Sequence, residues 1–440
     1  MASSQKPVDL LITGGTFVTM NPARDVLTDS VLVIDQGKFL WIGDRSTAFE
    51  LFEPAQEIEL SCEVVIPGLI NVHGHWAMAL FRGLVDDCAL EDWLSMIWKV
   101  EAEVISEETV ATGSRLAMLE MIRSGTTCAA DMYWHYVVTT EAARKAGFRM
   151  VNGPSFADIE GFEEYRNTNQ AIALDYLDEY QDVPLVHPCI QAHSAYMTNL
   201  DILSLVGKIA RDRNLLFITH AAESKGEMDM VRQKYGKTPI EVLDAAGLLG
   251  DRTLLAHCVH LSDDEITLLG ETGTSVAHCP SSNLKLSSGI ARVAEMIKAG
   301  VNVAFGTDGA ASNNDLDLFH EAQLAALVQK GVTGDPSVLP AEKVFSMLTI
   351  AGAQAVGLAE KIGSIEVGKL ADLAILDFDV PNLTPCYDHY SHLVYAISAG
   401  DVCHVMVEGQ FLMRNREMQT LDEAEIMEKA REIARTIRKI

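Results

Sequence analysis

The sequence has no paired cysteine motif and no long hydrophobic run. Its 8 cysteines include no Cys-x-x-Cys pair, which argues against a zinc ribbon or a disulfide framework and favours reduced thiols. No apolar run reaches the roughly eighteen residues of a membrane helix, and residues 1–6 are not followed by the apolar core of a signal peptide. We therefore expect a soluble, cytoplasmic protein with no membrane span.

Basic residues are scarce relative to acidic ones. The chain has 34 Lys and Arg against 62 Asp and Glu, which gives a formal net charge of -28 at pH 7. A surface of this sign repels nucleic acids and anionic membranes, so we expect a small-molecule substrate and neither of those partners. The 440 residues, 48% of them hydrophobic, suffice for about two to three domains or for one large barrel with an appendage. Assembly into a homo-oligomer stays open.

Short apolar runs alternate with helical stretches through the middle of the chain, as is typical of βα units in a parallel sheet. Eight runs have the pattern of strands: 65–75, 126–133, 149–156, 185–194, 215–223, 253–260, 274–281 and 301–309. Eight parallel strands are what a closed (β/α)8 TIM-type barrel requires. A doubly wound open sheet is the alternative, but no Gly-x-Gly-x-x-Gly follows the first strand. The sequence therefore predicts an α/β barrel.

The two ends of the chain have the pattern of short antiparallel strands. Residues 9–20 carry two β-rich runs separated by Gly14-Gly15, which predicts a hairpin. Three further stretches have strand or hairpin patterns, namely 30–43, 371–377 and 404–412. We predict a small β-sandwich domain built from both termini, with a closing amphipathic helix. The predicted division is 1–64 for the N-terminal part of the sandwich, 65–360 for the barrel, and 361–440 for the C-terminal part of the sandwich plus the helix.

Polar residues at the carboxyl ends of the strands are the candidates for an active site, because the sites of such barrels form there. His73 and His75 are two residues apart, so an extended strand places both imidazoles on one face. His220 and Asp308 follow two later strands. Three imidazoles and one carboxylate suit zinc, with iron or manganese as alternatives, and such an ion lowers the pKa of a bound water to about 7. Barrels of this kind that hold two bridged metal ions often use a modified lysine at the end of the fourth strand. Residues 185–194 contain no lysine, which favours a single divalent metal ion.

A nucleophilic water also needs groups that move protons. Glu223 lies about one helical turn beyond the third histidine and can act as a general acid or base. His257, at the end of the next strand, can hydrogen-bond the attacking water, and His260 and His278 compete for that role. If one oxygen of Asp308 binds the metal, its other oxygen is free to take the proton from the water.

Several strings along the chain share one resemblance. Residues 67–75 read Pro-Gly-Leu-Ile-Asn-Val-His-Gly-His, and residues 306–314 read Gly-Thr-Asp-Gly-Ala-Ala-Ser-Asn-Asn. Further strings with the same resemblance lie at 77–87, 256–261, 282–286 and 363–373. Together they resemble the amidohydrolase superfamily, specifically its branch of S-adenosylhomocysteine and 5'-methylthioadenosine deaminases and s-triazine hydrolases. The resemblance covers essentially the whole chain in order.

This resemblance implies a role for each candidate residue. It implies a mononuclear zinc or iron site of His73, His75, His220 and Asp308. It also implies that Glu223 delivers a proton to a ring nitrogen of the heterocycle and that His257 orients the metal-bound water. In the adenosine-type members it implies nucleoside contacts at Trp93, Glu101 and His193.

The sequence departs from this branch after the third strand. Relatives that take the carboxylate of S-adenosylhomocysteine resemble one another in an arginine there, whereas residues 151–155 of this chain read Val-Asn-Gly-Pro-Ser. An anionic tail then lacks its bidentate partner, which favours a neutral nucleoside or heterocycle. Arg166, farther along the same loop, is a cation that could compensate.

The predicted function is hydrolytic deamination. We expect a metal-dependent enzyme that replaces the exocyclic amino group of an adenosine-type nucleoside (5'-methylthioadenosine, adenosine or S-adenosylhomocysteine) with oxygen and releases ammonia. The alternatives on the same site are an s-triazine chlorohydrolase or aminohydrolase and a guanine or pterin deaminase. A third hypothesis is an inactive binding or structural paralogue, whose mark would be the loss of a metal ligand or of Glu223. The sequence retains all of these residues.

Overall fold

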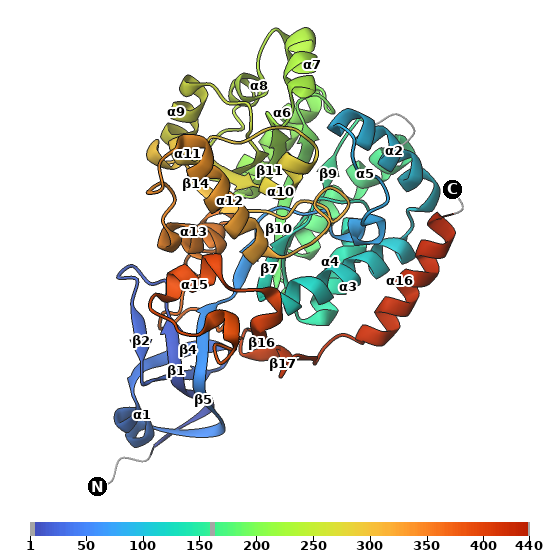
Figure 1. The fold of residues 1–440 in the computed structure, drawn as a ribbon. Helices are drawn as coiled ribbons and strands as arrows, with labels where there is room; N and C mark the ends of the chain where they lie inside the picture. The colour runs from blue at the N-terminus through green and yellow to red at the C-terminus, as the bar shows by residue number, and fades with distance from the viewer. Residues whose placement is uncertain (1–4, 159–162, 439–440) are drawn as a thin grey trace.

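Two sheets, one curled into a barrel and one open, organise the chain (Figure 1). The structure is a computed structural model that describes residues 5–158 and 163–438, without the side chains of residues 163–170. The barrel strands are parallel and neighbour one another in chain order: β6 (Leu69–Asn71), β7 (Thr126–Ala130), β8 (Arg149–Asn152), β10 (Val186–Ser194), β11 (Leu216–Ala221), β12 (Thr253–His257), β13 (Ser275–His278) and β14 (Asn302–Phe305). The Val72 N–H donates to the Phe305 carbonyl at 3.0 Å, which brings β14 next to β6 and nearly closes the barrel.

All eight barrel strands predicted from the sequence are confirmed, and so is the fold class. Strands β7, β8, β11, β12 and β13 are buried at every residue, because the barrel interior covers one face and helices cover the other. The short strand β9 (Ser155–Phe156) pairs with β10 beside the main path. Burial on both faces explains why most of these segments are apolar without a polar residue at every second position.

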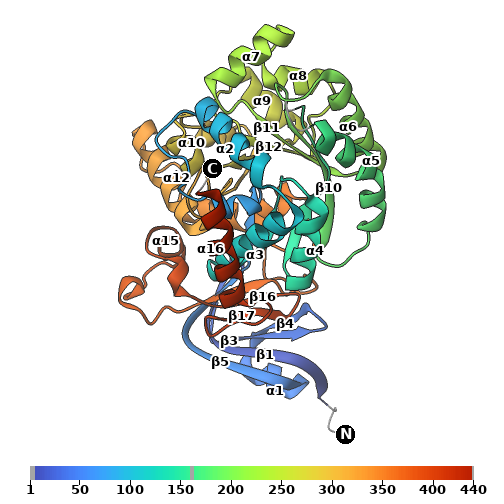
Figure 2. The ribbon, with the colours of Figure 1, turned by 90° about the vertical axis from the view of Figure 1, so that its right-hand side faces the viewer.

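Helices surround the barrel (Figure 2). They are α3 (Glu107–Arg123), α4 (Tyr136–Ala146), α5 (Glu163–Glu179), α6 (Leu200–Arg213), α7 (Lys225–Tyr235), α8 (Pro239–Ala245), α9 (Asp263–Thr272), α11 (Val293–Lys298), α12 (Leu318–Thr333), α13 (Ala341–Leu348) and α14 (Ile350–Ala355). Many begin at a side-chain cap; Ser106 and Asn199, for example, accept first-turn N–H groups of α3 and α6. Three more elements contribute to the region around the strand ends: η1 (Trp76–Phe81), α2 (Leu90–Val104) and α10 (Pro280–Lys285). Within the described ranges, no helix has the length and hydropathy needed to cross a membrane.

The second sheet combines the two ends of the chain, as predicted. Its strands are β1 (Lys6–Val18), β2 (Val26–Thr28), β3 (Ser30–Asp35), β4 (Lys38–Asp44), β5 (Phe52–Pro67), β15 (Leu373–Leu376), β16 (Val402–Val407), β17 (Gln410–Arg414) and β18 (Glu417–Met418). The C-terminal strand β15 pairs with the N-terminal strand β5, which joins the two halves. Strand β5 crosses the predicted boundary between residues 64 and 65, and the division into 1–64, 65–360 and 361–440 stays a prediction. Three short helices flank this sheet or lead into its strands: α1 (Arg45–Leu51), η2 (Pro381–Leu383) and η3 (Ala399–Asp401). Helix α15 (His389–Tyr395) packs on the barrel helices α12 and α13.

The hairpin predicted at Gly14-Gly15 is wrong. Both glycines lie inside the continuous strand β1, where the parallel pairing with β5 shifts register. Their φ angles are 72° and 67°, and a Cβ on Gly14 would lie 2.3 Å from the Leu60 carbonyl oxygen. The glycines therefore permit a bulge and a close backbone approach. The hairpins at residues 30–43 and 404–412 are confirmed.

The predicted closing helix is α16 (Glu423–Ile437). It packs on the barrel and not on the open sheet that precedes it in the chain. It buries Ile426, Ala430 and Ile437. Figure 2 shows it beside α3, and it also contacts η1, so it covers the barrel. The cysteines are all unpaired thiols, as expected.

A buried ion-pair network joins the barrel to the open sheet. Arg149 at the start of β8 donates to both oxygens of Asp372, at 2.8 and 3.1 Å, and to Glu408 at 3.0 Å. The side chains of Arg149 and Asp372 are each 1% exposed. Burying both charges is costly, but the bidentate geometry and the Glu408 N–H, which donates to Asp372 at 2.9 Å, compensate for the lost water.

We predict that Asp372→Asn destabilises the protein by about 3–5 kcal/mol, because it leaves the Arg149 guanidinium buried without its main counter-charge. Urea denaturation followed by circular dichroism measures this as a lower midpoint. Asp212→Asn is the control: it removes an exposed pair with Lys208 and should leave the midpoint unchanged. An Asp372→Asn midpoint equal to that of the control would show that the network contributes nothing to stability.

Candidate metal centre

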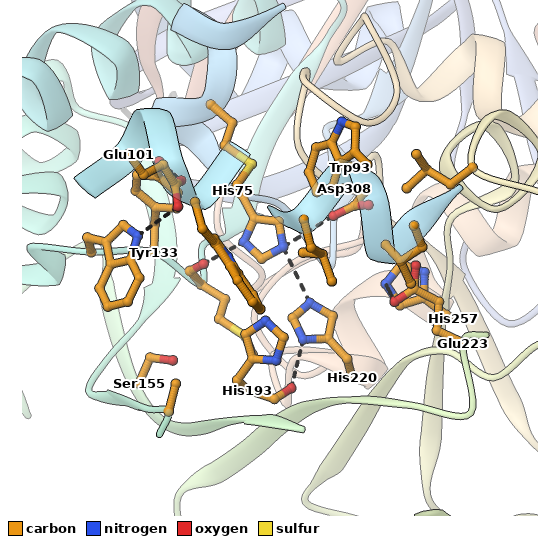
Figure 3. A pocket seen from close by; sticks show the side chains of 18 of the residues that line it. His75, Trp93, Glu101, Tyr133, Ser155, His193, His220, Glu223, His257 and Asp308 are labelled. Carbon is orange, nitrogen blue, oxygen red and sulfur yellow. Dashed lines mark hydrogen bonds and ion pairs between the residues drawn. The ribbon is translucent and has the colours of Figure 1, made fainter. Parts of the chain in front are cut away.

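The four predicted metal ligands meet at the carboxyl ends of three barrel strands. Figure 3 shows three of them, His75, His220 and Asp308. His73 and His75 follow β6, His220 lies within β11, and Asp308 follows β14. The Asp308 N–H donates to the His73 carbonyl at 3.1 Å, and Gly74 forms a parallel bridge with Asp308. Closure of the barrel between β14 and β6 therefore brings ligands from both ends of the barrel sequence together.

The donor atoms of these residues point at one another. His75 Nε2 lies 3.2 Å from Asp308 Oδ1 and 3.3 Å from His220 Nε2, and His73 Nε2 lies 3.6 Å from the same Asp308 oxygen. His73, His220 and Asp308 are buried. The donor atoms of His73, His75 and Asp308 lie within 4.8 Å of one another, and so do those of His73, His220 and His257. The two triads share His73, so the donors gather around one small volume.

Hydrogen bonds on the far side of two rings fix which nitrogen faces that volume. Nδ1 of His75 donates to the Met132 carbonyl at 2.5 Å, and Nδ1 of His220 donates to the His193 carbonyl at 2.7 Å. In the neutral rings Nε2 then carries a lone pair. His73 Nε2 is buried and has no hydrogen-bond partner in the part of the chain that the structure describes. With the rings neutral, the facing acceptors have no donor between them. A divalent cation satisfies such a group in place of the proton that His75 otherwise holds, so the residues fit one metal ion.

The electrostatics of the cluster agree with this fit. Burial lowers the pKa of His73 to about 4 and that of His220 well below its usual range. Burial also lowers the pKa of His75, but Asp308 outweighs it and raises that pKa to about 9. Burial likewise opposes ionisation of Asp308, but His73 and His75 hold its pKa well below the usual range. The cluster therefore attracts a cation, and a metal ion competes there with a proton.

The second oxygen of Asp308 is not free, contrary to the expectation from the sequence. Oδ2 accepts hydrogen bonds from the hydroxyls of Ser282, at 2.6 Å, and Ser312, at 2.8 Å. Ser282 lies in α10 just after β13, and Ser312 lies four residues beyond the aspartate. Both hydroxyls orient the carboxylate so that Oδ1 faces the histidines.

Glu223 and His257 lie side by side next to this cluster. Glu223 Oε2 is 3.7 Å from His257 Nε2, and burial raises the pKa of Glu223. His257 Nδ1 contacts Asn283 Oδ1 at 2.9 Å and therefore donates, which leaves Nε2 facing the glutamate. His260 instead donates to the Ser288 carbonyl, and His278 packs beside Phe305. Of these three histidines, only His257 lines the pocket.

A pocket of about 780 Å³, including its open mouth, lies against the cluster. Its size suits a ligand of roughly drug or nucleoside dimensions. Most of its wall is apolar or aromatic, from Met78, Leu90, Trp93, Leu94, Trp98, Met132, Tyr133, Trp134, Ala157, Tyr196 and Leu286. Among the residues that the structure describes, no lysine or arginine lines it. Arg166 belongs to helix α5, and its side chain lies outside the described part of the chain.

The three predicted nucleoside contacts, Trp93, Glu101 and His193, all line this pocket. Trp93 Nε1 is buried without a hydrogen-bond partner in the described structure. Glu101 accepts the Tyr133 hydroxyl on one oxygen and Trp134 Nε1, at 3.3 Å, on the other. Burial raises the pKa of Glu101 to about 7. The His193 ring packs edge-on against Trp98, with 6.3 Å between the ring centroids.

Comparison with known proteins identifies the family. Residues 64–412 match the Amidohydrolase family. The chain belongs to the amidohydrolase family. It is 39% identical over 447 residues to 5-methylthioadenosine/S-adenosylhomocysteine deaminase from Syntrophobacter fumaroxidans, covering 100% of both chains. It is 39% identical over 428 residues to 5'-deoxyadenosine deaminase from Methanopyrus kandleri, covering 97% of this chain and 98% of the relative.

A solved structure agrees over nearly the whole length. The crystal structure of an adenosine deaminase from Xanthomonas campestris with bound zinc superposes on this amidohydrolase with a TM-score of 0.96 at 36% identity. The superposition covers 99% of this chain and 100% of that one. The family resemblance inferred from the sequence strings is therefore confirmed.

Sequence reasoning missed the residues that orient the site of this amidohydrolase. Ser282, Asn283 and Ser312 occur in strings that carried the family resemblance, but no spacing rule linked them to Asp308 or His257. The sequence signal that could have identified them was their position in the segments that follow predicted strands. Adjacent parallel strands deliver such residues to one edge of the barrel, where they can meet the ligands.

We predict that His220→Ala loses stoichiometric metal, because it removes one of four donors from a site that should hold about one ion per chain. Elemental analysis of protein purified without chelator measures the content. His260→Ala is the control, since its ring contacts the Ser288 carbonyl outside the pocket and should leave the content unchanged. Full metal content in His220→Ala, or a wild-type protein without zinc, iron or manganese, would contradict the ligand set.

Proposed function

We propose that this amidohydrolase is a metal-dependent hydrolytic deaminase of adenosine-type nucleosides. The observation that carries the proposal is the placement of the buried Glu223 between a four-donor metal cluster and an aromatic pocket. Similar proteins are named as deaminases of adenosine and its 5'-modified forms, which supports deamination as the reaction. The enzyme would act on a C–N bond and release ammonia.

In this proposal His73, His75, His220 and Asp308 hold one divalent ion, zinc by analogy with the Xanthomonas structure, with iron or manganese as alternatives. Such an ion, when bound, acidifies a water molecule and so supplies a nucleophile at neutral pH. The chain itself orients the ligands through the Met132 and His193 carbonyls.

Glu223 is the proposed proton donor to the ring nitrogen next to the carbon under attack. Burial favours its protonated form, which is the form that can donate. His257 is held by Asn283 with Nε2 toward the glutamate, so it can orient the attacking water and accept its proton. We keep Asp308 as a second carrier of that proton to the leaving amine. That role requires the Ser282 or Ser312 hydroxyl to turn its hydrogen away from Oδ2.

Trp93, Glu101 and His193 are the proposed nucleoside contacts. The Glu101 carboxylate can accept two sugar hydroxyls, and the aromatic wall suits a flat purine ring. We propose adenosine or 5'-methylthioadenosine ahead of S-adenosylhomocysteine, because the described pocket offers no cation for a carboxylate tail. A cytoplasmic location, assembly into a homo-oligomer and the absence of nucleic-acid partners stay predictions from the sequence.

The decisive experiment is ammonia release from a panel of adenosine, 5'-methylthioadenosine, S-adenosylhomocysteine, guanine, a pterin and an s-triazine. We predict that Glu223→Gln lowers kcat on the preferred nucleoside by about 10²–10⁴-fold, because glutamine cannot donate the proton, while metal content is unchanged. Glu271→Gln, an exposed change on α9, is the control. Turnover confined to triazines, guanine or pterins would reject the nucleoside assignment, and a metal-loaded protein inactive on the whole panel would reject the deaminase.

We predict that KM for the nucleoside falls as pH rises through about 7, the pKa of Glu101. Above that pH the carboxylate is ionised and accepts both sugar hydroxyls, whereas below it one acceptor is protonated. Glu101→Gln should raise KM about 10-fold at about pH 8 and remove this pH dependence. Glu103→Gln, exposed on the same helix, should behave as wild type. A KM that is independent of pH in the wild-type enzyme would refute the contact.

A further inference from the structure

Three consecutive barrel helices carry a glutamate at their third position: Glu227 in α7, Glu241 in α8 and Glu265 in α9. In α8 and α9 this glutamate accepts the N–H of the capping residue, Thr238 at 2.8 Å and Ser262 at 2.7 Å. These are ordinary capping boxes, which stabilise the start of a helix.

Glu227 makes a different set of bonds. Its carboxylate reaches past the capping residue Ser224 and accepts the N–H groups of Ala222, at 3.2 Å, and Glu223, at 2.7 Å. The glutamate thus binds the backbone of the proposed proton donor and of the residue before it. The first turn of α7 is capped by the Ser224 hydroxyl, which accepts the Glu227 N–H at 3.0 Å.

The segment that Glu227 holds is strained and is tied to the neighbouring strand end. Ala222 has a φ of 54°, a left-handed conformation that is unfavourable for a residue with a side chain. Its carbonyl accepts the N–H groups of Val259 and His260, both at 2.9 Å. His257 has a φ of 73°. The Glu227 carboxylate on one side and β12 on the other therefore fix the turn from which Glu223 faces His257.

Stabilisation of helix α7 does not by itself explain why the Glu227 carboxyl is buried. Glu227 is 2% exposed, and burial raises its pKa to about 7. In the described structure no lysine or arginine pairs with it. A buried carboxylate without a cation is costly. Glu241 makes its capping bond from the surface, and Glu265, which is also buried, bonds the helix starts at Ser262 and Thr238. Glu227 differs from both because its carboxylate bonds the turn before its helix. The free-energy cost of burying Glu227 is explained if its bonds to Ala222 and Glu223 hold the active-site residues in position.

We propose that Glu227 is a positioning residue of the deaminase: its carboxylate holds the backbone of residues 222 and 223 and thereby aims the Glu223 carboxyl at the reacting ring. The proposal rests on the proposed function, because it assigns Glu223 the role of proton donor. Glu227 itself does not line the pocket and is not expected to touch substrate.

The test compares Glu227→Gln with Glu241→Gln in the metal-loaded enzyme. Glutamine keeps the size of the side chain but turns one acceptor into a donor that faces a backbone N–H. We expect Glu227→Gln to lower kcat about 10- to 100-fold with little change in KM and unchanged metal content. Glu241→Gln makes the same substitution at a capping glutamate that accepts one N–H, which the glutamine oxygen can still accept, and should keep wild-type kcat.

Hydrogen exchange gives a readout that does not depend on turnover. We expect the Ala222 and Glu223 amides to exchange faster in Glu227→Gln than in wild type, and to be unchanged in Glu241→Gln. Glu227→Asp, which keeps the charge but is one methylene shorter, should give an intermediate kcat and covers the case in which the glutamine variant does not fold.

Wild-type kcat in Glu227→Gln, or a loss of kcat that only follows the loss of folded protein, would overturn the positioning role. Unchanged exchange at residues 222 and 223 would overturn it as well. If the wild-type enzyme deaminates no nucleoside, the proposed function fails, and the exchange comparison still decides whether Glu227 holds this turn.

Discussion

Buried acceptor atoms that face one another without a donor are the constraint on which the site depends. His75 Nε2 faces His220 Nε2 at 3.3 Å and Asp308 Oδ1 at 3.2 Å, and His73 Nε2 lies 3.6 Å from the same Asp308 oxygen without a hydrogen-bond partner among the described residues. Such atoms repel one another unless a cation lies between them. The surrounding structure keeps them together by holding each residue from behind, through backbone carbonyls for the rings and through two serine hydroxyls for the carboxylate.

The contacts that close the barrel also bring the metal ligands together. The contact between β14 and β6 continues past the strand ends as the bond from the Asp308 N–H to the His73 carbonyl. A displacement of His73 or Asp308 would therefore disturb the contact between β6 and β14 that closes the barrel. This coupling explains how a site made from segments far apart in the chain can have the fixed geometry that catalysis requires.

The strained residues beside the site and the metal-binding groups lie at the carboxyl end of the barrel, whereas a buried ion-pair network stabilises the opposite end. Ala222, His257 and Asp308 all have left-handed backbone angles near the site, and each such residue costs of order 1–3 kcal/mol. At the other end Arg149 and Asp372 form a buried, bidentate ion pair that joins the two sheets. The division agrees with the general separation of function and stability between the two ends of such barrels.

The sequence by itself determined the order of strands and helices, the assembly of one sheet from both termini, the family and the residues that converge as donors. These properties follow from local periodicity and short motifs, such as two histidines on one face of a strand. Only the tertiary structure decided that Gly14-Gly15 forms a bulge, that Asp308 Oδ2 is occupied by two serines, and that His257 faces Glu223 while His260 turns away. Such contacts depend on which strand ends become neighbours when the barrel closes, and a local pattern does not encode that proximity.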